Sequence, residues 1–284
     1  MIQITECPRD AMQGIKKFIP TTVKAAYLNL LLKVGFDRLD FGSFVSSKAI
    51  PQLQDTAEVL SLLDLADTPT QLLAIVANRK GVEKACVYPS INFLGFPFSM
   101  SETFQQRNTH ASRAQALERI KEMVALCYTF QKQPLVYLSM AFGNPYGDPW
   151  DPDIVVDYAE QLVALDIKHL MLADTTGVST PENIRQLFSR LKQLFPMIDL
   201  GMHLHSTPQG VQEKIEAALI SGCQRLDTAL GGYGGCPMAS EQLTGNIPTE
   251  ALLSLLAKKG ISPQLNIEAL QEAQHYLPNV FREE

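Results

Sequence analysis

Hydrophobic positions along the chain follow two periods, one typical of buried strands and one typical of amphipathic helices. Short aliphatic, β-branched and aromatic runs predict eight strands, at 2–6, 37–42, 72–77, 85–88, 134–140, 168–173, 199–205 and 224–229. Between them, apolar residues recur every three or four positions and predict helices, most clearly at 22–34, 112–131, 151–165, 181–194, 208–221 and 249–259. This regular alternation of strand and helix indicates a parallel sheet built from repeated βα units.

Turn-forming residues support the boundaries of the predicted helices. A capping threonine followed by proline occurs at Thr180-Pro181 and at Thr207-Pro208, which predicts two helix starts. Glycines just beyond three predicted helices mark their ends: Gly35, Gly222 and Gly260.

Eight βα units in 284 residues favour a single (β/α)8 TIM barrel over an open doubly wound sheet. An open sheet would be expected to carry a glycine-rich phosphate loop early in the chain, and the sequence has no G-x-G-x-x-G or Walker-type loop. We predict that residues 1–262 form the catalytic barrel and that residues 263–284 form a short C-terminal helical extension packed on it.

Composition narrows the class of protein. With 46% hydrophobic and 19% charged residues, the chain can form a large core. A net charge of −6 and the lack of a basic, aromatic-rich stretch argue against a nucleic-acid partner. No apolar run approaches the roughly 20 residues of a membrane helix, and no leader precedes the first strand, so we expect a cytoplasmic protein with no membrane partner. Five cysteines without a Cys-x-x-Cys pair indicate neither a disulfide framework nor a zinc knuckle.

The carboxyl ends of the barrel strands are where chemistry is expected, and polar residues gather there. His203 and His205 are two residues apart on one strand, so their side chains share a face and could bind one metal ion. With the Asp10 carboxylate and the Asn246 amide oxygen, this ligand set favours Mg²⁺ or Mn²⁺ over zinc. The alternative is a pair of inward-facing histidines satisfied by hydrogen bonds.

Three further residues are candidates for catalysis. Arg9 beside Asp10 could stabilise a thioester oxyanion, or could form only a surface ion pair. Asp40 could orient Arg9, or could be a strand-end acid without a role. Cys236 lies in Gly-Gly-Tyr-Gly-Gly-Cys-Pro, where the glycines are typical of a mobile lid that carries a proton donor; a packed thiol is the alternative.

The chain resembles the 3-hydroxy-3-methylglutaryl-CoA (HMG-CoA) lyase family over nearly its whole length. The motifs that carry the resemblance, in the family's order, are Pro8-Arg9-Asp10-Ala11-Met12-Gln13, the run from Asp40 to Gln52, Phe142-Gly143-Asn144-Pro145-Tyr146, Asp174-Thr175-Thr176-Gly177-Val178, His203-Leu204-His205, and Gly234-Gly235-Cys236-Pro237 with Thr244-Gly245-Asn246.

The resemblance implies a metal-dependent carbon–carbon lyase that cleaves HMG-CoA, an acyl-CoA thioester, to acetyl-CoA and acetoacetate. It implies a divalent ion held by Asp10, His203, His205 and Asn246, with Arg9 stabilising the enolate and Cys236 donating a proton. We assign His203 as the base and expect a homodimer. Substrate contacts are expected from polar residues at the strand ends: Gln13, Ser43, Ser139, Asp174 and Thr176.

Departures from the family pattern leave other functions open. Asp40 stands where the family usually has Glu, Ser206 stands where it has Asp after His-x-His, and Glu6 lies one place after the usual strand-1 acid. A related lyase or aldolase acting on another 3-hydroxyacyl-CoA or hydroxy acid is therefore one alternative. A catalytically silent paralogue that binds a ligand is another.

Overall fold

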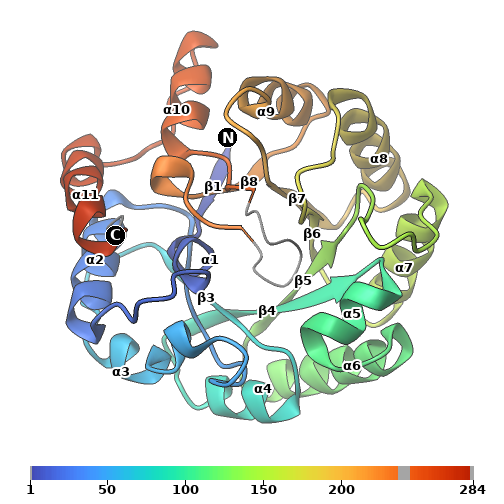
Figure 1. Ribbon diagram of the computed structural model, residues 1–284, viewed down its shortest axis with the longest axis horizontal. Coiled ribbons are helices and arrows are strands. Elements are labelled where there is room, and N and C mark those ends of the chain that lie inside the picture. The colour runs from blue at the N-terminus through green and yellow to red at the C-terminus, as the bar shows by residue number, and fades with distance from the viewer. Residues whose placement is uncertain (1, 236–243, 282–284) are drawn as a thin grey trace.

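Eight parallel strands close into a barrel in the order in which they occur along the chain (Figure 1). The computed structural model describes residues 2–235 and 244–281. The predicted TIM barrel is thereby confirmed. The strands are β1 (Gln3–Glu6), β2 (Arg38–Ser43), β3 (Gln71–Ile75), β4 (Ile91–Ser99), β5 (Gln133–Ser139), β6 (His169–Asp174), β7 (Asp199–Leu204) and β8 (Arg225–Thr228).

Helices form a ring around the strands, as Figure 1 shows in a view down the barrel. They follow the strands in sequence, so each packs over the neighbouring part of the sheet. Their bounds are α1 (Pro8–Gln13), α2 (Thr21–Val34), η1 (Pro51–Leu53), α3 (Thr56–Ser61), α4 (Arg79–Cys86), α5 (Glu102–Thr109), α6 (Arg113–Thr129), α7 (Pro152–Ala164), α8 (Pro181–Leu194), α9 (Val211–Ile220), η2 (Leu230–Gly232), α10 (Thr249–Lys258) and α11 (Ile267–Val280).

One predicted strand is wrong, and one predicted helix starts too early. Residues 85–88, expected as the fourth strand, include the end of α4, which begins after Asn78; the Asn78 side chain caps it by accepting from Gly81 N. The fourth strand is β4, whose pattern is interrupted in the sequence by Gly95 and Pro97. Helix α9 begins three residues later than predicted, because Thr207-Pro208 precede it in a turn.

Because alternate residues of a strand face opposite sides of the sheet, the apolar side chains form two layers, one outside the barrel wall and one inside it. Side chains facing the helices form the main core with the inner faces of those helices. Side chains facing inward fill the barrel with a smaller cluster made of Leu73, Ile75, Phe93, Leu135, Tyr137, Met171 and Ala173. The barrel interior is therefore packed, and polar chemistry is confined to its two ends.

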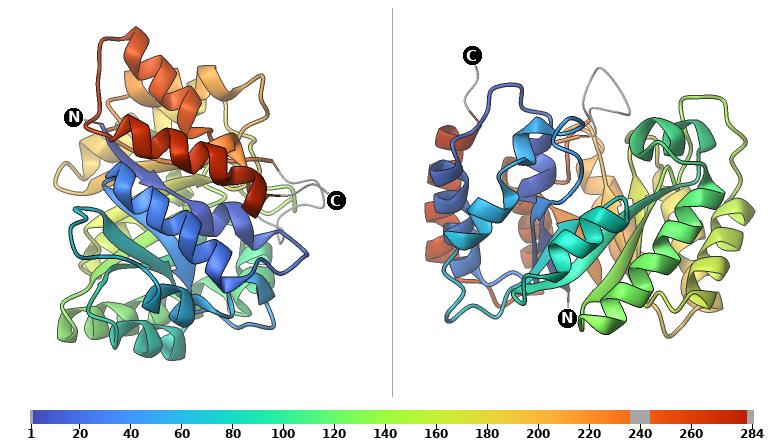
Figure 2. Two further views of the ribbon diagram at one scale, coloured as in Figure 1. Left: turned by 90° about the vertical axis from the view of Figure 1, so that its left-hand side faces the viewer. Right: turned by 90° about the horizontal axis from the view of Figure 1, so that it is seen from below.

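The amino-terminal end of the barrel carries a partly buried charge network. The Asp199 carboxylate accepts from Arg225 Nε at 2.9 Å and from Arg38 Nη2 at 3.2 Å. His169 Nδ1 lies 2.9 Å from the same carboxylate, and Arg225 Nη2 donates to Gln3 Oε1 at 2.6 Å. The side view in the right panel of Figure 2 places the N-terminus at this end and α1 at the opposite end. The network therefore lies across the barrel from the predicted site.

Helix α11 packs against α2 on the outside of the barrel, as the left panel of Figure 2 shows. The Tyr27 ring from α2 stacks on Tyr276 with 6.5 Å between centroids and meets Phe281 edge-on. Asn266 N donates to Val34 O just before α11 begins. The division into a barrel at 1–262 and an extension at 263–284 stays a prediction.

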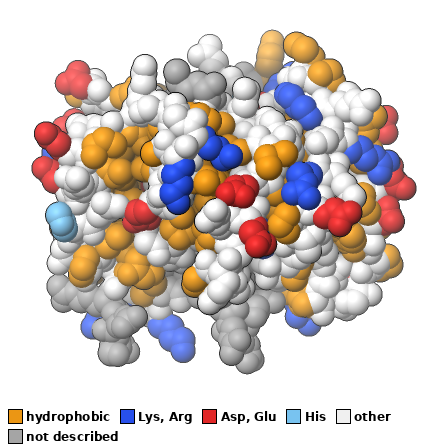
Figure 3. Space-filling view, turned by 90° about the horizontal axis from the view of Figure 1, so that it is seen from above, with side chains coloured by type: hydrophobic (Ala, Val, Ile, Leu, Met, Phe, Trp, Pro, Cys, Tyr) orange, Lys and Arg blue, Asp and Glu red, His pale blue; other side chains and the backbone are white. Residues whose placement is uncertain are grey.

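On the face that Figure 3 shows, acidic, basic and hydrophobic side chains are intermixed. Among the described residues, the structure has no helix with both the length and the apolar character needed to cross a membrane.

Candidate active site

A pocket opens at the carboxyl ends of the strands, and its lining includes Arg9, Asp10 and Gln13 of α1. Short helix α1 follows β1 directly and carries Arg9 and Asp10 into this pocket, while His203 comes from β7 and His205 from the residue just after its end. The pocket also has an apolar wall, as expected for a site that receives an organic substrate. Its lining includes Gln13, Ser43, Val45, Ser46, Ile50, Ile75, Pro97, Phe104, Tyr137, Ser139 and Thr175.

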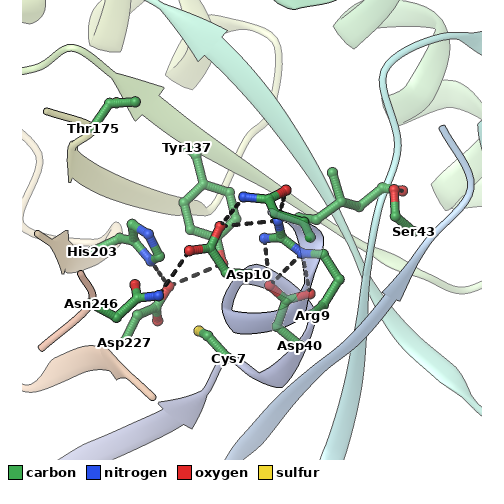
Figure 4. A network of polar contacts seen from close by, with 12 residues as sticks. Cys7, Arg9, Asp10, Asp40, Ser43, Tyr137, Thr175, His203, Asp227 and Asn246 are labelled. Carbon is green, nitrogen blue, oxygen red and sulfur yellow. Dashed lines mark hydrogen bonds and ion pairs between the residues drawn. The ribbon is translucent and has the colours of Figure 1, made fainter. Parts of the chain in front are cut away.

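The two histidines face each other across the pocket floor. His203 Nε2 and His205 Nε2 are 3.0 Å apart, and His205 Nε2 is 3.8 Å from Asp10 Oδ2. Each ring holds its other nitrogen against an acceptor, because His203 Nδ1 lies 3.1 Å from Asp227 Oδ2 and His205 Nδ1 lies 3.2 Å from Thr175 O. Such partners favour N–H at Nδ1 and leave the Nε2 lone pairs directed toward a common point. Figure 4 shows His203, Asp10 and Asp227 in this arrangement.

The charges around this point suit a divalent cation. Burial, together with neighbouring His203, lowers the pKa of His205 to about 4, so its ring is neutral. Burial alone would raise the pKa of Asp10, but Arg9 and both histidines outweigh it and hold the pKa well below its usual range. Ligand atoms of Asp10, His203 and His205 all lie within 4.8 Å of one another. A carboxylate and two imidazoles, with the two Nε2 atoms 3.0 Å apart, fit a bound metal ion.

Asn246, in the segment after the glycine-rich loop, lies beside Asp10 and the two histidines. Its Nδ2 donates to Asp10 Oδ2 at 2.8 Å and to Tyr233 O at 2.9 Å. A backbone bridge between His205 and Asn246 fixes its position beside β7. Ligation through the Asn246 amide oxygen stays a prediction.

Arg9 is held in place by two carboxylates and an amide. Its Nε and Nη2 both donate to Asp40 Oδ2, at 2.9 Å and 2.6 Å, and its Nη1 donates to Asp10 Oδ1 at 3.1 Å and to Gln13 Oε1 at 2.9 Å. Burial raises the pKa of Asp40 to about 6 against the opposing charge of Arg9, so the carboxyl is ionised at neutral pH. The shorter side chain of Asp40 thus reaches the guanidinium, which is fixed beside the pocket (Figure 4).

The other predicted residues fall into two groups. Gln13, Ser43 and Ser139 line the pocket. Asp174 and Thr176 do not belong to its lining among the described residues. Their substrate contacts stay predictions, as does the proton-donor role of Cys236, which lies outside the described residues.

Asp174 points away from the pocket because alternate residues of a strand face opposite sides. It is buried against α9, where Lys214 Nζ donates to Asp174 Oδ2 at 2.7 Å. The same ammonium donates to His205 O at 2.8 Å and Gly177 O at 2.9 Å. Lys214 therefore joins the ends of β6 and β7 directly behind the histidines.

Sequence reasoning missed Tyr137 and Asp227. The Tyr137 hydroxyl donates to Asp227 Oδ2 at 3.1 Å, the same oxygen that contacts His203 Nδ1. A signal was present: Tyr137 is two residues before Ser139 on one strand, and Asp227 pairs in register with His203. The alternation could therefore have marked Tyr137 as inward-facing, whereas the contact of Asp227 with His203 depends on a strand register that the sequence pattern does not contain.

Fold and site together define a TIM barrel with a metal-ligand cluster and an anchored arginine at the catalytic end. The HMGL-like family model matches residues 2–277, and the chain belongs to that family.

Individual relatives agree with this assignment. Mitochondrial hydroxymethylglutaryl-CoA lyase of Bos taurus is 30% identical over 95% of this chain and 82% of its own length. The hydroxymethylglutaryl-CoA lyase of Bacillus subtilis is 30% identical over 95% of this chain and 89% of its own. The structure of an HMG-CoA lyase from Acinetobacter baumannii, in complex with coenzyme A and 3-methylmalate, is similar with a TM-score of 0.91 and 31% identity, covering 99% of this chain and 91% of that one. The predicted resemblance is confirmed.

Proposed function

We propose that the chain is a carbon–carbon lyase that cleaves HMG-CoA to acetyl-CoA and acetoacetate with the help of a divalent cation. The observation that carries the proposal is the meeting of Arg9, Asp10, His203 and His205 in one pocket at the catalytic end of the barrel. Lyases named for this substrate match the chain over most of its length.

Asp10, His203 and His205 would hold the cation, with Asn246 as the expected fourth protein ligand. A divalent ion at this point supplies Lewis acidity, which lowers the pKa of a hydroxyl group and polarises a carbonyl. The donor set of oxygen and imidazole nitrogen suits Mg²⁺ or Mn²⁺, and we propose one of these two as the metal.

Side chains of the protein remove the proton, stabilise the charge that develops and return a proton. Cleavage requires loss of a proton from the tertiary hydroxyl, and we propose His203 as the base. Because His203 Nδ1 faces Asp227, the proton would be taken at Nε2, and the cation would be left to Asp10, His205 and Asn246 while that nitrogen carries the proton. Burial would lower the pKa of His203, but the hydrogen bond to Asp227 and the charge of Asp10 outweigh it and raise the pKa. A protonated ring can therefore be accommodated after the transfer.

Bond breaking leaves the electron pair on the thioester fragment as an enolate. Arg9 offers a fixed cation beside the pocket for the enolate oxygen, and Asp40 prevents the guanidinium from turning away. Protonation of the enolate carbon then completes the reaction and yields acetyl-CoA. We propose Cys236 as this donor, on the grounds of its sequence context and not of its position.

The substrate is tested by offering the purified chain a panel of 3-hydroxyacyl-CoA thioesters and free hydroxy acids. We expect HMG-CoA to give the highest kcat/KM, because Ser43, Ser139 and Gln13 add polar groups to a pocket that also has an apolar wall. A higher kcat/KM for another thioester would support the related lyase. No turnover of any compound would support the silent paralogue.

Two further proposals concern the oligomeric state and the cellular location. We propose a homodimer, which sedimentation analysis of the purified chain tests by its mass, and a single-chain mass would contradict it. We also propose a cytoplasmic location. The relatives include a lyase named as cytoplasmic and one named as mitochondrial.

A further inference from the structure

A second group of metal-binding side chains lies in the barrel beside the cluster of Asp10, His203 and His205. Ligand atoms of Cys7, His203 and Asp227 lie within 4.8 Å of one another, and all three residues are buried. Cys7 follows β1 and reaches this place because its backbone N–H continues the pairing with β8, donating to Thr228 O at 2.8 Å. Figure 4 shows the thiol of Cys7 near Asp227.

Two of these side chains have capacity for a further partner. Asp227 uses Oδ2 for both Tyr137 and His203, whereas its buried Oδ1 has no hydrogen-bond partner among the described residues. The Cys7 thiol makes one long contact, from Sγ to Thr5 O at 3.7 Å. A buried carboxylate oxygen without a partner is costly, and a bound cation would remove that cost.

Charged groups surround this place. Besides Asp227, the carboxylates of Asp40 and Asp10 and the guanidinium of Arg9 interact electrostatically with the Cys7 side chain. A metal ion bound by Cys7 and Asp227, with the thiol proton released to solvent, would offset part of the repulsion among the three carboxylates.

We propose that Cys7, His203 and Asp227 form a binding site for a thiophilic divalent ion, Zn²⁺ being the best match. Thiolate sulfur, imidazole nitrogen and carboxylate oxygen are the three donor types that Zn²⁺ takes, with water in the remaining position. The donor set proposed for Mg²⁺ or Mn²⁺, made of oxygen and imidazole nitrogen atoms, contains no thiolate.

The two metal sites share His203 through opposite sides of its ring. His203 Nδ1 faces Asp227, whereas His203 Nε2 faces His205. Zn²⁺ at Nδ1 displaces the Asp227 hydrogen bond that sets the tautomer, so it disturbs the neighbouring site. We therefore expect Zn²⁺ to weaken the binding of Mn²⁺.

The test uses Co²⁺ as a spectroscopic probe of the purified chain, with Zn²⁺ as competitor. Wild type is expected to show thiolate-to-cobalt charge-transfer absorption, which Zn²⁺ removes. Cys7→Ala and Cys7→Ser are expected to lose this absorption and to bind Zn²⁺ about tenfold more weakly or worse, measured by calorimetry. Because the readout is metal binding, it is independent of whether HMG-CoA is the substrate.

Matched variants separate the proposed site from its neighbours. Cys127→Ala changes another buried cysteine, and Cys236→Ser removes the thiol of the glycine-rich loop; both are expected to retain the absorption. His205→Ala removes a ligand of the other cluster only, so it too is expected to retain it. Absence of the absorption in wild type, its persistence in the Cys7 variants, or its loss in Cys236→Ser would each overturn the proposal. Circular dichroism checks that the Cys7 variants remain folded.

Discussion

Asp40 illustrates how one side chain determines the position of another. Both donors on one edge of the Arg9 guanidinium are directed to its carboxylate, and Arg9 Nη1 is directed to Asp10 and Gln13. The guanidinium therefore has a fixed plane at the pocket. Asp40 is one methylene shorter than the Glu usual in the family, yet its Oδ2 lies 2.6 Å from Arg9 Nη2.

Replacing Asp40 by Asn is expected to lower kcat by about 10- to 100-fold, because Arg9 loses its charged anchor at the pocket. Steady-state kinetics on HMG-CoA measures the effect. Asp55→Asn is the matched control, since Asp55 forms a buried ion pair with Lys24 away from the pocket. An unchanged kcat in Asp40→Asn would show that the pair does not position the guanidinium for catalysis.

Glu6 is a buried acid outside the pocket, held by Leu230 N at 2.7 Å and by Thr249 Oγ1 at 2.6 Å. Burial raises the pKa of Glu6 from its ordinary value of 4.5 to about 8, with Glu250 contributing in the same direction. The folded protein thus keeps a proton that the unfolded chain has already lost. The contribution is fully present below pH 4.5 and is lost as the pH rises to about 8.

Urea unfolding of wild type and Glu6→Gln across this pH range checks the linkage. We expect the stability of wild type to fall with rising pH more steeply than that of Glu6→Gln, which cannot ionise. Parallel pH dependences would mean that folding does not raise the pKa of Glu6 and would contradict this account.

At the scale of elements, α9 is tied to the ends of β6 and β7 by the single ammonium of Lys214. Its three partners are Asp174 Oδ2, Gly177 O and His205 O. Because these acceptors are contributed by two strand ends, Lys214 stabilises the place where His203 and His205 lie.

Lys214→Met is expected to lower the free energy of unfolding by about 3–5 kcal/mol, because it leaves the Asp174 carboxylate buried without its counter-charge. Denaturant unfolding measures this. The double variant Lys214→Met with Asp174→Asn is expected to recover part of the loss. Lys168→Met, which breaks an exposed pair with Asp166, serves as control and should cost at most about 1 kcal/mol. A similar small loss in Lys214→Met would contradict the buried-pair account.

The elements also show how far the sequence could predict the fold. Most strands and helices were predictable because their apolar periods are unbroken. The fourth strand was not, since Gly95 and Pro97 interrupt its pattern while the end of α4 is apolar. Gly95 is explained only by three-dimensional packing, because a Cβ there would lie 2.7 Å from Ile75 Cδ1 on β3.

For the site, spacing along one strand was sufficient to bring His203 and His205 together. The partners from other elements were harder to foresee. Asp227 is 24 residues from His203, and Lys214 is 40 residues from Asp174. Such pairs depend on strand register and helix packing, which a local sequence pattern does not contain.

At the scale of the whole molecule, the barrel separates two polar ends by an apolar interior. The amino-terminal end carries the network of Arg38, Asp199 and Arg225, and the carboxyl-terminal end carries the pocket. Closure of all eight strands brings β1 against β8, which is what places Asp10 beside the histidines of β7. The proposed lyase chemistry therefore depends on the complete barrel.

The most direct measurement of the central claim is product identification after HMG-CoA is incubated with chain stripped of metal by a chelator. The account predicts no products until Mg²⁺ or Mn²⁺ is returned, and then acetyl-CoA and acetoacetate in equal amounts; His205→Ala should form neither at the same cation concentration. Equal rates with and without the cation, or full activity of His205→Ala, would contradict it.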